Sequence, residues 1–144
     1  MAIRVFVDGA EGTTGLKIDE RLRGRRDVEV LSIDPALRKD ARARRALLHA
    51  ADVAFLCLPD DAARESAALA EGSDAIVLDA STAHRVSPGW AYGFPELSPA
   101  HRAAIASAGR IAVPGCHATG FLAIVYPLVA LGILPRDYPL AATS

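Results

Sequence analysis

The feature that most restricts the fold of this chain lies at its N-terminus, where a short apolar run leads into a glycine-rich turn. Residues 3–7 read Ile-Arg-Val-Phe-Val, which is typical of a buried strand. The turn that follows has glycines at positions 9, 12 and 15, and an amphipathic helical pattern continues to Gly24. A strand, a tight glycine turn and a helix in this order predict the first part of a βαβ unit.

The same alternation continues along the chain. Further strands are expected at residues 28–33, 53–58, 75–78 and 110–113, and further helices at residues 40–51, 60–72, 98–109 and 121–134. This series predicts an α/β fold with a doubly wound parallel sheet and right-handed crossovers. Ligands of such sheets bind beyond the carboxyl ends of the strands. We therefore expect the glycine turn, the loop at 79–97 and the turn after residue 113 to open onto one edge.

Composition narrows the possible functions. The 144 residues include 16 basic and 17 acidic side chains, so there is no basic excess for binding nucleic acid. The most apolar tract, 121–134, is shorter than the roughly 18–20 residues of a membrane span. The N-terminus does not resemble a signal peptide, the two cysteines do not suggest a disulfide framework, and no His/Cys cluster has zinc-ligand spacing. We expect a cytoplasmic protein without a metal site and without nucleic-acid or membrane partners.

The glycine turn indicates a dinucleotide site. Gly9-x-x-Gly12-x-x-Gly15 is a variant of the known fingerprint. In that arrangement the first glycine permits the turn, the second admits the pyrophosphate and the third lets helix and strand pack. Glu11 is then expected to point away from the phosphates, which it would repel. The alternative is a structural turn without a ligand.

The end of the second expected strand bears on the choice between NAD and NADP. Asp34 lies where an acidic residue would bind the ribose 2′-hydroxyl of NAD. Arg38 and Lys39 follow closely and could neutralise the 2′-phosphate of NADP, which we favour. The alternative for these cations is a solvated helix face, and we prefer it for the remaining basic residues there: Arg42, Arg44 and Arg45.

Cys116 is the candidate nucleophile. It follows a strand-like run and precedes a helix-like one, and a helix N-terminus favours the negative charge of a thiolate. A dinucleotide together with a nucleophilic thiol suggests a dehydrogenase that works through a thioester. The alternative is an ordinary buried cysteine, which is the interpretation we give to Cys57. His117 is not expected to be the base, because adjacent helical residues point about 100° apart.

Two further patterns complete the predicted site. The loop at 79–85 offers hydroxyls and an arginine suited to a phosphate or carboxylate, although an ordinary polar loop is equally compatible with it. His84 in this loop could contact substrate. No tyrosine has a lysine four residues later, which excludes the short-chain reductase type of active site.

Five segments, in order along nearly the whole chain, resemble N-acetyl-gamma-glutamyl-phosphate reductase, and most closely its shorter, type 2 branch. They are residues 8–18, 55–63, 79–85 and 92–97 and the motif Pro114-Gly115-Cys116-His117-Ala118-Thr119-Gly120. The resemblance implies NADPH-dependent reduction of the acyl phosphate to N-acetylglutamate 5-semialdehyde, with release of phosphate, in arginine biosynthesis. In the longer branch an asparagine and a tyrosine flank Pro-Gly-Cys, where this chain has Val113 and His117.

The resemblance also implies the roles of individual residues. Cys116 would be the catalytic nucleophile. Cofactor binding would fall to Gly9, Gly12, Thr13, Thr14 and Gly15. Asp34, Arg38 and Lys39 stay candidates for the ribose end because of their position after the second expected strand. Substrate binding would fall to Ser81, Thr82 and Arg85. Two other functions stay open: an enzyme like aspartate-semialdehyde dehydrogenase, and a catalytically silent NADP-binding module.

The resemblance implies a longer protein. Family members carry a second domain for substrate binding and dimerisation, which includes a catalytic histidine. We expect residues 1–137 to form a Rossmann-like NADP-binding domain, residues 138–144 to begin the second domain, and the rest of that domain to be missing. The full-length enzyme is expected to be a homo-oligomer. The 144-residue chain is expected to bind NADP(H) but to reduce the acyl phosphate poorly or not at all.

Overall fold

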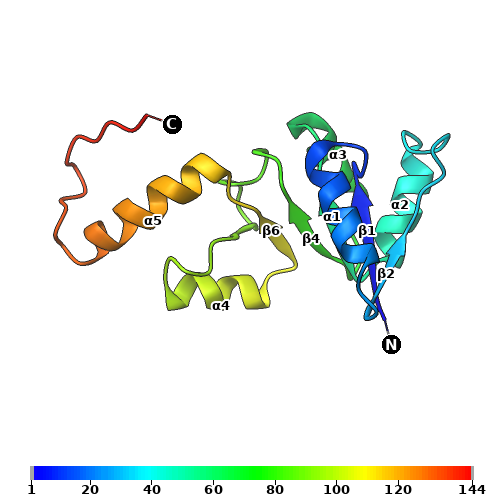
Figure 1. The fold of residues 1–144 in the computed structure, drawn as a ribbon, viewed down its shortest axis with the longest axis horizontal. Helices are drawn as coiled ribbons and strands as arrows, with labels where there is room; N and C mark the ends of the chain where they lie inside the picture. The colour runs from blue at the N-terminus through cyan, green and yellow to red at the C-terminus, as the bar shows by residue number, and fades with distance from the viewer. Residues whose placement is uncertain (1, 144) are drawn as a thin grey trace.

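The computed structural model describes residues 2–143, which form one parallel sheet with helices on its two faces and a last helix that extends away from it (Figure 1). The strands are β1 (Ile3–Asp8), β2 (Val28–Leu31), β3 (Val53–Leu56), β4 (Ile76–Asp79), β5 (Ala91–Tyr92) and β6 (Arg110–Ala112). The helices are α1 (Thr13–Arg23), α2 (Ala41–Ala50), α3 (Asp60–Leu69), α4 (Pro99–Ser107) and α5 (Cys116–Ala130).

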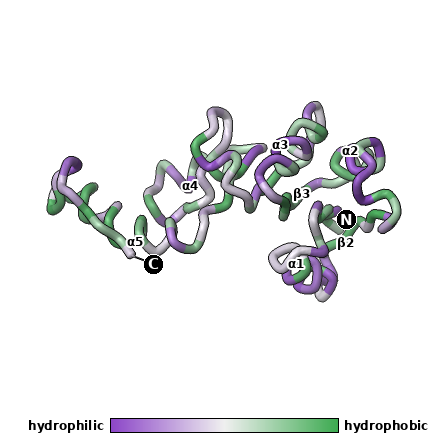
Figure 2. The backbone as a smooth tube through the Cα atoms, turned by 90° about the horizontal axis from the view of Figure 1, so that it is seen from above, coloured by the Kyte–Doolittle hydropathy of each residue, from purple (hydrophilic) through white to green (hydrophobic). Residues whose placement is uncertain are grey.

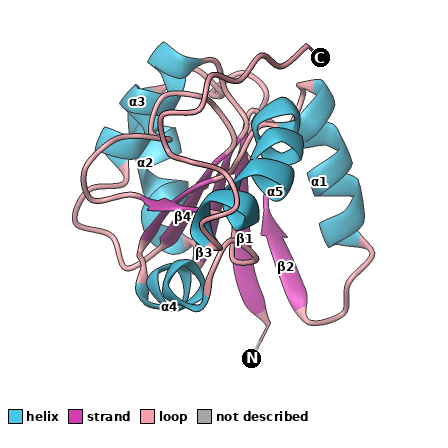
Figure 3. Ribbon diagram, turned by 90° about the vertical axis from the view of Figure 1, so that its left-hand side faces the viewer, coloured by secondary structure: helices cyan, strands magenta, loops and turns pink. Residues whose placement is uncertain are grey.

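The order of the strands confirms the predicted doubly wound sheet. It is β2-β1-β3-β4-β6-β5, and every pairing is parallel. The chain leaves β1 towards β2 on one side and returns to place β3 on the other side. Helix α1 and the packed pair α2–α3 accordingly lie on opposite faces of the sheet (Figure 3). The switch in direction between β1 and β3 is where such sheets open a crevice for a ligand.

The core lies between the sheet and the α2–α3 layer. Its fully buried large side chains include Phe6, Leu48, Leu56 and Val77, which come from β1, α2, β3 and β4. The central strands are apolar on both faces, but only the face toward α2–α3 is fully buried, because residues of β3 and β4 alternate between buried and partly exposed positions and α1 packs mainly on β1 and β2. The same apolar runs that predict strands therefore also anchor the layers to one another.

Three elements differ from the sequence-based expectation. The loop at 79–97 contains β5, whose two residues pair with β6 and extend the sheet edge. Helix α5 begins at Cys116 rather than at residue 121. Helix α3 ends at Leu69 rather than at residue 72, its N-cap is Pro59, and the Asp60 carboxylate binds the backbone N–H and hydroxyl of Thr82. Ser98 is the N-cap of α4, and its hydroxyl accepts the N–H of His101.

Helix α5 stands apart from the other helices. It is mostly hydrophobic and lies at the opposite end of the molecule from α1 and α2 (Figure 2). None of its residues is buried, and Ile124 is 67% exposed. No helix among residues 2–143 has the length and apolar character needed to cross a membrane.

Candidate functional site

The glycine turn after β1 is tightly packed at two of its three glycines. Gly9 has a φ of +88°, and a Cβ there would lie 2.3 Å from the carbonyl oxygen of Cys57. A Cβ on Gly15 would lie 2.1 Å from the carbonyl oxygen of Gly9. Only glycine fits these positions without movement of the backbone. These contacts match the roles predicted for the first and third glycines, which are a tight turn and close packing of α1.

Gly12 has a different environment. It is the N-cap of α1, has no side chain to cap the helix, and donates its N–H to Gly9 O at 3.1 Å. A Cβ at Gly12 would meet nothing closer than 3.5 Å. The start of α1 is therefore exposed at Gly12, Thr13 and Thr14, where helix N–H groups favour an anion.

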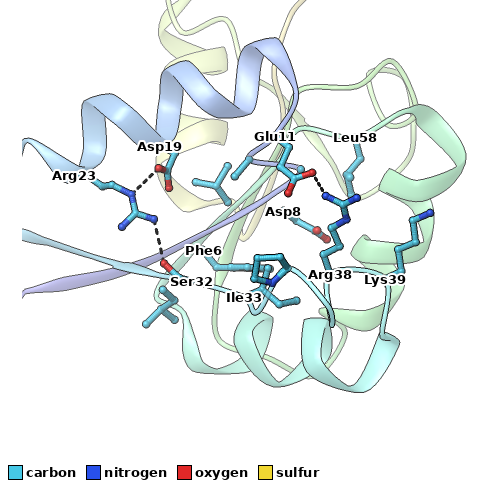
Figure 4. A pocket seen from close by; sticks show the side chains of 15 residues that line it. Phe6, Asp8, Glu11, Asp19, Arg23, Ser32, Ile33, Arg38, Lys39 and Leu58 are labelled. Atoms are coloured by element: carbon cyan, nitrogen blue, oxygen red, sulfur yellow. Dashed lines mark hydrogen bonds and ion pairs between the residues drawn. The ribbon is translucent and has the colours of Figure 1, made fainter.

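Two pockets flank this turn along the carboxyl edge of the sheet. The β2-side pocket, about 420 Å³, lies between the ends of β1 and β2 and runs along Gly9, Ala10 and Glu11 to Arg38 and Lys39 (Figure 4). The β4-side pocket, about 290 Å³, is lined by Gly12, Thr13, Thr14, Cys57, Leu58 and Ala80. The glycine turn thus divides one continuous edge into two sites, one on each side of the start of α1.

Charged side chains line the β2-side pocket. Arg38 forms an ion pair with Glu11, and Arg23 binds Asp19 at 2.6 Å (Figure 4). Lys39 lies beside Arg38 on the pocket wall. Asp34 does not line this pocket, and its carboxylate instead accepts the N–H of Ala36 at 2.8 Å, within its own turn. Of the three residues that bear on the choice between NAD and NADP, Arg38 and Lys39 therefore line the pocket and Asp34 does not.

A buried ion pair fixes the start of the turn, and sequence reasoning missed it. The Asp8 carboxylate accepts hydrogen bonds from Arg44 Nε and Nη2 at 3.1 and 3.0 Å and from Ser66 Oγ at 2.6 Å. The solvated position predicted for Arg44 is therefore wrong, because this side chain is buried. A signal was present, since Arg44 shares a helix face with Leu47 and Leu48 at i+3 and i+4. Asp8 thus ties β1 to α2 and α3 directly before Gly9.

Cys116 is exposed and is the first residue of α5. Gly115 is the N-cap and supplies no side-chain cap, while Thr119 donates both its N–H and its hydroxyl to Gly115 O, at 2.9 and 2.8 Å. These bonds hold the first turn of the helix together. The thiol therefore lies at a helix N-terminus, where the partial positive charge favours a bound or developing anion.

Arg85 connects this helix start to the loop after β4. Its Nε donates to Val113 O at 3.0 Å and its Nη2 to Ala80 O at 3.3 Å. Its Nη1 lies 2.7 Å from the place that a Cβ on Gly115 would occupy, so Gly115 lets the guanidinium lie against the backbone beside Cys116. Arg85 thus contacts both the wall of the β4-side pocket and the turn that carries the thiol.

The strand order brings Cys116 to the same edge as the β4-side pocket. Ala80, which lines that pocket, follows β4, and Cys116 comes four residues after β6, the neighbour of β4. Neighbouring strands lie about 4.8 Å apart. Along this edge come, in order, the β2-side pocket, the glycine turn, the β4-side pocket and Cys116. The strand order therefore puts the three predicted segments at one edge of the sheet, and Cys116 lines neither of the two pockets.

The predicted substrate loop is held largely by its own hydrogen bonds. The buried Asp79 carboxylate accepts from the Ser81 N–H and hydroxyl at 2.9 and 2.7 Å, and His84 Nδ1 lies 2.6 Å from it. His84 is buried and stacks on Trp90 with 4.1 Å between ring centroids. Of the residues predicted to bind substrate, Ser81 is buried in this network, Thr82 contacts Asp60, and Arg85 faces Gly115.

Cys57 departs from its expected place in the core. It follows β3, is half-buried and lines the β4-side pocket. Burial, and then the charges of Asp79 and Asp8, raise the pKa of its thiol to about 11. Cys57 is therefore protonated at neutral pH even though it lies beside the start of α1. No group of three or more His, Cys, Asp or Glu residues among those described is placed to hold a metal ion.

Comparison with known proteins places these features in a family. Residues 35–105 match the family described as semialdehyde dehydrogenase, NAD binding domain. N-acetyl-gamma-glutamyl-phosphate reductase from Trichormus variabilis is 55% identical over 98% of this chain and 44% of its own length. The Sinorhizobium medicae protein of the same name is 48% identical over all of this chain and 47% of its own length. The chain thus spans somewhat less than half the length of these relatives.

Solved structures show the same fold at lower sequence identity. Aspartate semialdehyde dehydrogenase II from Vibrio cholerae, complexed with ASA, aligns over 90% of this chain and 47% of its own with a TM-score of 0.65 and 17% identity. Aspartate semialdehyde dehydrogenase with NADP from Candida albicans aligns over 91% and 48% with a TM-score of 0.62 and 18% identity. At these identities the likeness supports the fold alone.

Proposed function

Because this chain belongs to the N-acetyl-gamma-glutamyl-phosphate reductase family, we propose that it forms the NADP-binding part of such a reductase and carries its nucleophilic thiol. The observation that carries the proposal is the placement of an exposed cysteine at the start of α5, on the same sheet edge as the glycine turn and its two pockets. A thiol and a dinucleotide must meet at one place for a thioester to be reduced.

The residues around the turn suit a dinucleotide. Gly9 and Gly15 build a turn that a Cβ would block, and the start of α1 carries no side-chain cap. The pyrophosphate would lie at Gly12, Thr13 and Thr14, against helix N–H groups. The adenosine end would occupy the β2-side pocket and the nicotinamide end the β4-side pocket. Arg38 and Lys39 in the first of these favour a 2′-phosphate, and therefore NADP.

In the proposed reaction the thiolate of Cys116 attacks the γ-acyl carbon of N-acetyl-gamma-glutamyl phosphate. The bond from this carbon to the phosphate oxygen breaks, and inorganic phosphate leaves with the bonding electron pair. Bound NADPH supplies the hydride that reduces the resulting thioester. The carbon–sulfur bond then breaks, which releases N-acetylglutamate 5-semialdehyde and returns the thiolate. Covalent capture divides one difficult reduction into two easier steps.

Arg85 is the residue of this chain best placed to act on the phosphate group. Its guanidinium lies against Gly115, next to the thiol, and is held there by two backbone carbonyls. A fixed guanidinium beside a helix N-terminus favours a phosphate dianion in that position. Ser81 and Thr82 support this arrangement by holding the loop, through Asp79 and Asp60.

Acyl transfer to the thiol tests the proposal directly. Incubation of the protein with N-acetyl-gamma-glutamyl phosphate should release phosphate and add one N-acetylglutamyl group to the peptide that contains Cys116, as read by mass spectrometry. Cys116→Ser should abolish the labelled thioester and keep NADPH binding, measured by nicotinamide fluorescence. A matched incubation with aspartyl phosphate should label the protein much less. Preferential labelling by aspartyl phosphate, or labelling that survives in the Cys116→Ser variant, would refute this function.

A further inference from the structure

The proposed function leaves one charged residue of the glycine turn unexplained. Glu11 lies between Gly9 and Gly12, where a bound pyrophosphate would be repelled by a carboxylate facing it. In the structure the side chain extends over the β2-side pocket and forms an ion pair with Arg38, which comes from the turn after β2 (Figure 4). The carboxylate thus neutralises the Arg38 guanidinium, the group that would recognise a 2′-phosphate.

The other acidic side chains that line this pocket are already bound by cations. Asp8 is bound by Arg44, and Asp19 is bound by Arg23. Lys39 forms no ion pair with any described residue. Glu11 is therefore the one acidic side chain lining the pocket that neutralises Arg38, and its loss would free the guanidinium without disturbing another pair.

The ion pair between Glu11 and Arg38 is of a kind that a bound ligand can replace. The side chains of Glu11 and Arg38 are 67% and 50% exposed, and 27 residues separate them along the chain. Exposed ion pairs of this kind contribute little to stability. A phosphate dianion carries more charge than a carboxylate and offers a guanidinium more acceptor oxygens. A ribose 2′-hydroxyl, which is neutral, has no comparable ability to displace Glu11.

We infer that Glu11 is a specificity-determining residue that competes with the 2′-phosphate of the cofactor for Arg38. The inference rests on the proposed cofactor role of this chain and adds a mechanism to it. In the free protein the Glu11 carboxylate forms an ion pair with Arg38. When a dinucleotide with a 2′-phosphate binds, the phosphate replaces the carboxylate at Arg38, and the carboxylate moves into solvent. Glu11 therefore lowers the affinity for NADPH and leaves the affinity for NADH unchanged.

The test compares the binding of NADPH and NADH to the wild-type chain and to its Glu11→Gln, Arg38→Ala and double variants, by nicotinamide fluorescence at low salt. Glu11→Gln should tighten NADPH binding by about twofold to fivefold, the range expected when a competing exposed ion pair is removed. NADH binding should not change. The gain should be absent when Arg38 is already alanine, and it should shrink at about 0.5 M salt.

The matched control is Glu20→Gln, which removes the same charge from the exposed face of α1, outside the pocket lining. It should leave both affinities unchanged. Weaker NADPH binding in Glu11→Gln would mean that Glu11 positions Arg38 and would overturn the inference. Equal tightening of NADPH and NADH, or a gain that persists with Arg38→Ala, would also overturn it. Failure of the wild-type chain to bind either dinucleotide would instead overturn the proposed function, and the inference with it.

Discussion

Replacing Gly15 with alanine should reveal how tightly α1 packs on the glycine turn. The new Cβ would lie 2.1 Å from Gly9 O, and real Cβ contacts are essentially never shorter than 3.0 Å, so the helix must move by at least 0.9 Å. The obstructing atoms belong to the backbone of the turn and cannot rotate away. Forced overpacking of this kind costs about 1–3 kcal/mol.

A control in the same helix isolates that cost. Gly24 ends α1 with a φ of −75°, and a Cβ there would meet only Arg21 O at 3.6 Å, an ordinary contact. Gly24→Ala should therefore stabilise the protein by about 0.4–1 kcal/mol, because it restricts the unfolded chain. Gly15→Ala restricts the unfolded chain to a similar extent, but it also carries the steric cost of the contact with Gly9 O. The difference between the two variants should be about 1–3 kcal/mol.

Urea denaturation followed by Trp90 fluorescence measures this difference. Trp90 is the single tryptophan, and it packs against the core and stacks on His84. With a urea dependence of about 2 kcal/mol per molar, the two midpoints should lie roughly 0.5–1.5 M apart. Gly15→Ala should also weaken NADPH binding by about tenfold, since a displaced turn loses a hydrogen bond to a charged group. Equal midpoints together with unchanged NADPH affinity would refute the packing argument.

Three further outcomes follow from the burial of particular groups. Arg44→Ala should lower the free energy of unfolding by about 3–5 kcal/mol, because it leaves the buried Asp8 carboxylate without its cation. The control Arg42→Ala, on the exposed face of the same helix, should change it by about 0.5 kcal/mol or less. Urea denaturation measures both values, and equal losses of stability in the two variants would contradict the buried ion pair. Iodoacetamide at neutral pH should alkylate the exposed Cys116 and spare Cys57, whose pKa of about 11 keeps the thiol protonated. Peptide mass spectrometry would contradict this if both cysteines were labelled at similar rates. Because the pKa of Cys57 is raised on folding above its usual 9.0, its contribution to stability is complete below about pH 9 and is lost as the pH rises towards 11, so the wild-type urea midpoint should fall more over this range than that of Cys57→Ala, and parallel curves would count against it.

Much of the fold was predictable because its signals are local. Apolar runs for β1, β3 and β4, separated by helical patterns, indicate a parallel sheet, and the serine and proline at 98–99 mark the start of α4. The two-residue β5 carries no such signal, because its strand identity comes only from pairing with β6. Short edge strands of this kind cannot be inferred from periodicity.

The candidate site divides in the same way. Gly9, Gly15 and Cys116 could be named from the sequence, since a tight turn and a nucleophile at a helix start depend on residue type and spacing. The partners of Asp8 could not, because Arg44 and Ser66 reach it from helices 36 and 58 residues away. The same holds for Cys57, whose raised pKa comes from burial and from two carboxylates on other strands.

The sequence by itself therefore determined the order of the helices and of every strand but β5, and it identified the glycine turn and Cys116 as candidate sites. Only the tertiary structure decided that Arg44 is buried and paired, that Arg85 lies against Gly115, and that Glu11 holds Arg38. The physical reason is the separation along the chain of the residues that decide each property. Backbone conformation and hydrophobic periodicity are set by neighbouring residues, whereas the state of a charge depends on which distant groups the fold brings within a few ångströms of it.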